Sequence, residues 1–275
     1  MGEKLSKTQV RKLTHGAPRT SYPYSIEHWY QRQITKLIKK WDETAKDYVN
    51  GVLSRYIKQG TALTTDASDD PSERSWVDQF MDDLARLGIV LEATGSDNDL
   101  TKLTSRFCTV VDTFAYRNVK AQFAVVGIDP ISSDIAIRDY VKAKIGENTQ
   151  LIKSLRQDYV QDLQKDIYRS ITKGQGVPEV TKQITERTGM ANRHAALIAN
   201  DQTGTILGQL DAYRSKKAGA EKYIWTSMED ERVRPKHQGL DRTVQRYDDP
   251  GGGDDGQLPG EPIRCRCVAD PVLDF

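Results

Sequence analysis

Hydrophobic residues recur every three or four positions over most of the chain, which is the pattern of amphipathic helices. The pattern predicts a first helix of about nine turns from Ser25, a helix-capping residue, to Ile57. Two further helices are predicted over residues 76–87 and 100–123. Between the first two helices, residues 61–73 are polar, acidic and contain a proline, so they are predicted to form a surface loop or linker.

The second half of the chain continues the helical pattern in shorter pieces. We expect a helix from residue 135 to Gly146 and a stronger one from about Thr149 to the "KGQG" segment. Pro178 begins and Gly189 ends the next predicted helix, because proline favours the first turn and glycine follows the last. A final helix is predicted over residues 191–219.

The pattern changes at residue 221. "EKYIWTSM" is rich in aromatic and β-branched residues, which predicts a strand, and the remaining residues show no helical period. Residues 248–262 are a loop of glycine, proline and aspartate. The predicted fold class is therefore mainly α, with a small C-terminal α+β module at 221–275. We expect a flexible basic arm at 1–21, a helical domain at 22–145 and a second domain at 146–275.

Composition and charge narrow the class of protein. Of 275 residues, 37% are hydrophobic and 29% charged, so the chain is polar yet able to bury a core. No apolar run approaches the roughly 20 residues of a membrane span, so no membrane partner is expected and synthesis takes place in a cytoplasm. Residues 1–60 contain 12 Lys or Arg against 5 Asp or Glu, whereas residues 61–100 contain 2 against 10. A nucleic-acid contact is therefore predicted only within the first 60 residues, at Lys4, Lys7, Arg11 and Lys12. The alternative is that the lysines of this segment form the solvated face of a helix and its tail.

Three residues of the terminal module are candidate metal ligands. Cys265 and Cys267 can present two sulfurs to one ion, and the imidazole of His237 can occupy a third corner of a tetrahedron. The fourth ligand is Asp230, Asp241 or water. A structural zinc ion would stabilise a module of about 55 residues whose own core is small. The alternative is that both thiols are simply buried, as we expect for Cys108 in the apolar stripe of its helix.

The charged stretch "DERVRPKHQGLD" also fits a metal-dependent hydrolase or nuclease, in which acids hold an ion and His237 acts as a base. Charge runs of this kind more often form solvated turns. The chain lacks HExxH, GxSxG and the phosphate-binding glycine motifs. We therefore predict that the protein is not an enzyme and assign no catalytic residue.

The spacing of the C-terminal residues resembles that of a known family. "GMANRHAALIANDQTG", then "AGAEKYIWTSMEDERVRPKHQGLD" and "PGEPIRCRCV", are similar to the Mu F-like minor head proteins of tailed phages, also called the head morphogenesis family. The resemblance covers about residues 146–270. Five of the residues that match the family motif are predicted to have a structural role: Trp225, Arg232, Arg234, Asp241 and Arg266. The other matching residues are Asp230, Val233, His237, Leu240, Pro262, Cys265 and Cys267.

The resemblance implies a structural role in the virion. Members of the family enter the procapsid in few copies, associate with the portal, and influence head assembly and the packaging or exit of DNA. For this chain it implies a place in the capsid interior near the portal vertex. The implied partners are the portal protein, the major capsid protein, other copies of this chain and packaged DNA. A DNA-binding protein of the head interior is the alternative.

Overall fold

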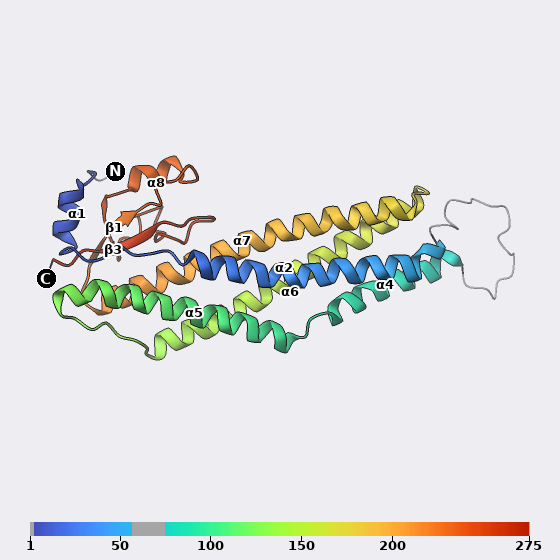
Figure 1. Ribbon diagram of the computed structural model, residues 1–275, viewed down its shortest axis with the longest axis horizontal. Coiled ribbons are helices and arrows are strands. Elements are labelled where there is room, and N and C mark those ends of the chain that lie inside the picture. The colour runs from blue at the N-terminus through green and yellow to red at the C-terminus, as the bar shows by residue number, and fades with distance from the viewer. Residues whose placement is uncertain (1–2, 57–74, 275) are drawn as a thin grey trace. The chain divides into compact units, whose positions relative to one another are not determined.

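The computed structural model describes residues 3–56 and 75–274, and they form a mainly helical chain with one small antiparallel sheet (Figure 1). The predicted fold class is thereby confirmed. The predicted linker at 61–73 and Ile57 lie outside the described residues. The elements, in order, are α1 (Lys7–Leu13), α2 (Tyr24–Tyr48), η1 (Val49–Leu53), α4 (Trp76–Ala93), α5 (Asp97–Phe123), η2 (Ala124–Val126), α6 (Ile135–Thr172), α7 (Val177–Lys217), β1 (Lys222–Thr226), α8 (Pro235–Leu240), β2 (Val244–Arg246) and β3 (Val268–Pro271).

Two long helices replace four shorter predicted ones. The helices expected to meet near Gly146 are one continuous helix, α6, and those expected to be separated at Gly189 are one continuous helix, α7. A glycine inside a helix costs only about 1 kcal/mol relative to alanine, which the packing of a long apolar face offsets. Pro178 does lie in the first turn of its helix, as predicted, because that position needs no backbone donor.

Residues 3–21, part of the basic arm that the sequence predicts to be flexible, include the helix α1. Ser6 and Gln9 cap α1 reciprocally, each side chain bonding the backbone of the other. The N–H of Leu5 donates to the carbonyl of Arg242 at 2.9 Å, and the N–H of Leu273 donates to the carbonyl of Leu13 at 2.9 Å. These bonds attach α1 beside the small sheet (Figure 1).

The chain folds into two compact units, neither of which is continuous in sequence. Unit 1 comprises Met1–Gln31, Lys102–Asn148 and Leu197–Phe275, and unit 2 comprises Arg32–Thr101 and Thr149–Ala196. The structure thus divides the chain differently from the predicted ranges 22–145 and 146–275.

Unit 2 is built from amphipathic helical segments around a core that includes Trp41, whose ring centroid lies 5.9 Å from that of Tyr159. Arg187 joins α7 to α6 by donating to Asp166 at 2.5 Å and to Asp162 at 2.9 Å. These are half-buried pairs, so their contribution to stability is modest beside that of the apolar core.

Unit 1 contains the sheet, in which β1 lies between β2 and β3 and is antiparallel to both. Trp225 on β1 is opposite Ala269 on β3. The fully buried Arg214 of α7 joins this unit's helices, donating to Asp112 of α5 at 2.5 Å and to the carbonyls of Ile131 and Ser132. None of the described helices is long and apolar enough to cross a membrane.

Candidate metal centre

The structure brings His237, Cys265 and Cys267 together in unit 1. His237 lies on α8, a six-residue helix that the sequence pattern did not predict and that begins with Pro235. The two cysteines lie just before β3. The Nδ1 atom of His237 is 3.5 Å from the Sγ of Cys265 and 3.6 Å from the Sγ of Cys267. All three side chains are buried, and their candidate ligand atoms lie within 4.8 Å of one another.

These distances suit a tetrahedral ion. Zinc binds thiolate sulfur at about 2.3 Å and imidazole nitrogen at about 2.0 Å, so tetrahedral angles place nitrogen and sulfur about 3.5 Å apart. The two separations of 3.5 and 3.6 Å from His237 therefore match the edges of a zinc-centred tetrahedron. Imidazole nitrogen and thiolate sulfur are both typical ligands of zinc.

A carboxylate fixes the orientation of the imidazole. The Nε2 atom of His237 lies 3.0 Å from the Oδ2 of Asp254, which leaves Nδ1 facing the two sulfurs. Lys236 forms an ion pair with the same carboxylate. Burial raises the pKa of Asp254, but hydrogen bonds with Lys236 and His237 outweigh burial and hold that pKa below its ordinary value. A carboxylate on the far nitrogen of a ligating histidine is the usual way to fix its tautomer.

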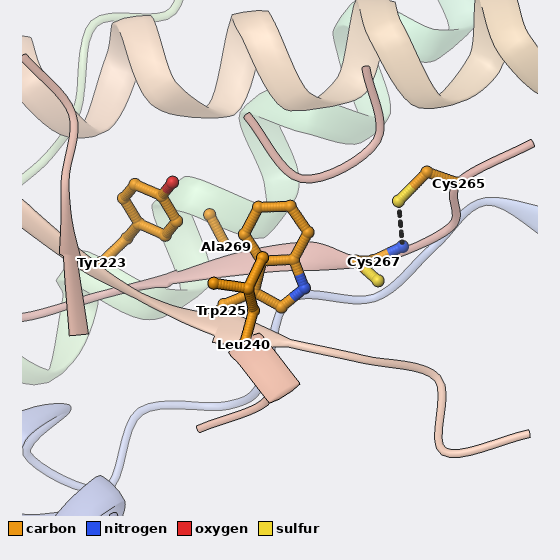
Figure 2. Packing of buried hydrophobic residues seen from close by; sticks show 6 residues of the cluster. All are labelled: Tyr223, Trp225, Leu240, Cys265, Cys267 and Ala269. Carbon is orange, nitrogen blue, oxygen red and sulfur yellow. Dashed lines mark hydrogen bonds between the residues drawn. The ribbon is translucent and has the colours of Figure 1, made fainter. Parts of the chain in front are cut away.

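Hydrogen bonds also favour negative charge on the sulfur of Cys265. The backbone N–H of Cys267 lies 3.4 Å from the Sγ of Cys265 (Figure 2). A hydrogen bond from the Cys267 thiol is the largest cause that lowers the pKa of Cys265, and the pKa of Cys267 is raised in turn because its neighbour holds the negative charge. The buried indole N–H of Trp225, which has no oxygen or nitrogen acceptor, points toward Cys267 and favours a thiolate there (Figure 2).

The imidazole is correspondingly basic. Its hydrogen bond with Cys265 raises the pKa of His237, burial lowers it, and the bond with Asp254 raises it again. The three groups therefore share protons in a buried cluster. Binding a divalent cation would displace those protons and satisfy all three ligands at once.

Two glycines of α7 make room for the segment that carries the cysteines. A Cβ atom at Gly204 would overlap the carbonyl oxygens of Gly260 and Cys265, and one at Gly208 would overlap that of Pro259. Gly260 itself has a φ of 95°, a conformation that side chains rarely adopt. The close approach of segment 259–265 to α7 therefore depends on glycine. The sequence pattern did not predict this requirement.

The residue between the cysteines anchors their segment to α2. Arg266 donates to both carboxylate oxygens of Glu27, at 2.6 and 3.0 Å. Glu27 is 2% exposed, and it also accepts hydrogen bonds from Tyr22 and Asn200. Burial raises the pKa of Glu27, but the bonds from Arg266, Tyr22 and Asn200 outweigh burial and lower it. The sequence singled out Arg266 but not its partner, because 239 positions separate the two.

The other predicted site residues surround the cluster without joining it. Asp230 is exposed and its Oδ1 accepts the backbone N–H of Arg232 at 3.0 Å, so its role as a fourth ligand stays a prediction. Arg234 donates to the carbonyl of Ile263. Asp241 is buried and accepts the backbone N–H of Ser227 at 2.9 Å. Asp254, on the glycine-rich loop, was missed because aspartates there are also typical of solvated turns.

The predicted nucleic-acid residues lie at the start of the chain. Lys4 donates to the carbonyl of Gln238 at 2.6 Å. Lys7, Arg11 and Lys12 are exposed on α1. Lys7 and Arg11 also line, with Arg19, a cavity of about 400 Å³ in unit 1.

The fold and the candidate site together define the class of protein: a mainly helical chain with a small module that contains cysteine and histidine. Residues 161–270 match the family described as Phage Mu protein F like protein, so the resemblance seen in the sequence is confirmed over this part of the chain. An uncharacterized protein of Haemophilus influenzae is 33% identical over 138 residues, which are 50% of this chain and 30% of that protein. No solved structure matches the chain.

Proposed function

We propose that the protein is a structural minor head protein of a tailed phage, which lies inside the capsid near the portal and assists head assembly and DNA packaging or exit. This proposal is supported by the family match over residues 161–270, which includes β1, β2, most of β3 and both candidate metal-binding segments. Its partners are the portal protein, the major capsid protein and further copies of this chain.

In this proposal a zinc ion fastens the terminal module. His237, Cys265 and Cys267 hold the ion, which joins α8 to the segment before β3. The module is small, and structural zinc contributes on the order of 10 kcal/mol or more to folding in such modules. The ion therefore keeps a surface of the module rigid enough to recognise another head protein.

The test is the composition of heads isolated before tail attachment. We expect this chain at low copy number, in a fixed ratio to the portal protein, in wild-type heads. A phage that encodes Cys265→Ser should produce heads with less of the chain, whereas Cys108→Ala, a core cysteine outside the metal centre, should leave its copy number unchanged. Heads that contain no copy of the chain at all would contradict the proposal.

The competing function is a metal-dependent hydrolase acting on DNA. The geometry does not favour His237 as the base of such an enzyme, since both of its ring nitrogens already face other groups. Zinc-loaded protein is expected to leave duplex and single-stranded DNA uncut. Cleavage that disappears in His237→Ala while the variant stays folded would replace the structural proposal with this one.

A further inference from the structure

Three protein ligands leave one corner of a tetrahedron open, and the nearby buried carboxylates are used elsewhere. Asp241 accepts the backbone N–H of Ser227 with one oxygen and the Nε of Arg242, at 3.2 Å, with the other. Asp254 faces the far nitrogen of His237. Neither carboxylate belongs to the group of ligand atoms that come together in the described part of the chain.

The cluster adjoins a cavity of about 30 Å³, which is large enough to hold a water molecule. His237, Cys265 and Cys267 form part of its wall. The rest of the wall comes from the loop before α8 and from the arginines beside the cysteines, and many of these residues are exposed. A small ligand can therefore reach the ion although the three protein ligands are buried.

The wall is rich in positive charge. It includes four arginines: Arg232, Arg234, Arg264 and Arg266. Arg266 is paired with Glu27, and Arg234 donates to a backbone carbonyl. The side chains of Arg232 and Arg264 have no ion pair within the described residues.

The charge of the metal centre itself does not oppose an anionic ligand. A divalent ion with two thiolates and a neutral imidazole has no net charge, so the exposed guanidinium groups decide the sign of the potential in the cavity. Asp230 is a negative group in the same wall, and its carboxylate accepts the N–H of its own loop. An anionic oxygen ligand is favoured over a neutral or cationic one.

We propose that the fourth coordination position is open and exchangeable, and that it binds a small carboxylate which displaces water and is held by Arg232 and Arg264. This inference rests on the proposed metal centre. The carboxylate is either a free solute or an aspartate or glutamate side chain of a neighbouring head protein. Sites with three protein ligands and one exchangeable ligand differ from closed structural zinc sites in this respect.

The experiment uses the full chain loaded with Co²⁺, whose visible absorption reports the ligands and geometry of the site. Titration with acetate should change the spectrum saturably in the wild type and in Asp230→Asn alike. Arg232→Gln and Arg264→Gln should each weaken acetate binding by about fivefold. The matched control, Arg138→Gln on the exposed face of α6, should leave the titration unchanged.

Two outcomes would overturn the inference. A spectrum that acetate never alters means that the fourth position is closed. A spectrum that changes in Asp230→Asn before any acetate is added means that Asp230 is the fourth ligand. Both outcomes leave the metal centre intact, whereas a chain that binds no Zn²⁺ or Co²⁺ under reducing conditions removes the centre and this inference together.

The source of the carboxylate is identified in assembled heads. Heads that contain the cobalt-loaded chain in acetate-free buffer should give the acetate-like spectrum if a neighbouring protein supplies the ligand. They should give the spectrum of the water-bound form if the ligand is a solute.

Discussion

The ring of His237 lies between a carboxylate on one side and two sulfurs on the other, with separations of 3.0, 3.5 and 3.6 Å. Such an arrangement is costly without an ion, because buried polar groups must share protons in a low-dielectric environment. It becomes favourable when one cation neutralises both thiolates. The geometry of the single histidine thus predicts how each ligand variant behaves.

We expect Cys265→Ser and His237→Ala to lose tightly bound zinc and to unfold at lower temperature, since two remaining ligands hold the ion weakly. Metal analysis of the purified chain and thermal unfolding with and without a chelator measure both effects. Cys108→Ala is the control. Burial raises the pKa of Cys108 to about 12, so it is a neutral core thiol, and its removal should lower stability without changing zinc content.

A second residue-scale prediction concerns Asp83 in unit 2. Burial raises the pKa of Asp83, but hydrogen bonds from Tyr56 at 2.8 Å and Arg55 at 2.5 Å outweigh burial and lower it. A lowered folded-state pKa means that stability from this carboxylate is fully present above the unfolded pKa of about 3.9 and is lost as the pH falls through the folded value.

Asp83→Asn should therefore reduce stability by about 2 kcal/mol at neutral pH and unfold with a weaker dependence on acid pH than the wild type. Denaturant unfolding at a series of pH values measures the difference. Equal losses at neutral pH and at pH values well below 3 would show that Asp83 contributes by packing and not by charge.

At the scale of elements, the sequence predicted apolar faces well and helix ends poorly. Gly146 and Gly189 resembled helix ends because glycine often follows a last turn, but nothing in the sequence reports the packing that extends α6 and α7 through them. The strand at 222–226 was predicted from Tyr223, Ile224 and Trp225, which are buried on β1. Helix α8 has only six residues, too few for a hydrophobic period to be visible.

The candidate site was also predictable only in part, because the sequence shows residue types but not long-range contacts. His237, Cys265 and Cys267 are chemically distinctive, so residue type alone identified them as candidate metal ligands. Glu27 and Asp254 are ordinary acids whose roles arise from contacts across 239 and 17 positions, and such contacts leave no local pattern. The role of Gly204 and Gly208 was likewise not predictable from the sequence. These glycines are needed because segment 259–265 packs closely against α7, and not because of the helix itself.

Gly208→Ala tests that close approach. The added methyl group overlaps the carbonyl of Pro259, so segment 259–265 must move away from α7 and carry Cys265 with it. We expect a loss of stability of about 1–3 kcal/mol and weaker zinc binding. Gly146→Ala, a helical glycine whose Cβ would meet nothing within 4 Å, should be neutral or stabilising. Calorimetry and competition with a chelator compare the two variants.

At the scale of the whole molecule, charge is concentrated in particular segments although the net charge is only +1. Lys7 and Arg11 lie one turn apart on α1 and are exposed. If both residues contact DNA phosphates, the double variant Lys7→Gln with Arg11→Gln should lose about two phosphate contacts. The slope of log K for DNA binding against log salt concentration should then become shallower by close to 2. Fluorescence titrations of duplex DNA at several salt concentrations measure it.

The matched control for this prediction is Arg138→Gln with Lys142→Gln, an exposed pair with the same spacing on α6. It should leave the slope unchanged. Equal effects of the two double variants would mean that DNA responds to overall charge and not to α1.

The two units should respond differently to loss of metal. The candidate ligands all belong to unit 1, whereas unit 2 has its own apolar core and the ion pairs of Arg187 with α6. An ion that binds only the folded state stabilises the elements it joins, by an amount set by its concentration and affinity. Chelation under reducing conditions should therefore speed hydrogen exchange in peptides covering 222–240 and 265–271. Peptides covering 155–187 should keep their protection, and a uniform loss across both sets would show that the metal supports the whole chain as one cooperative unit.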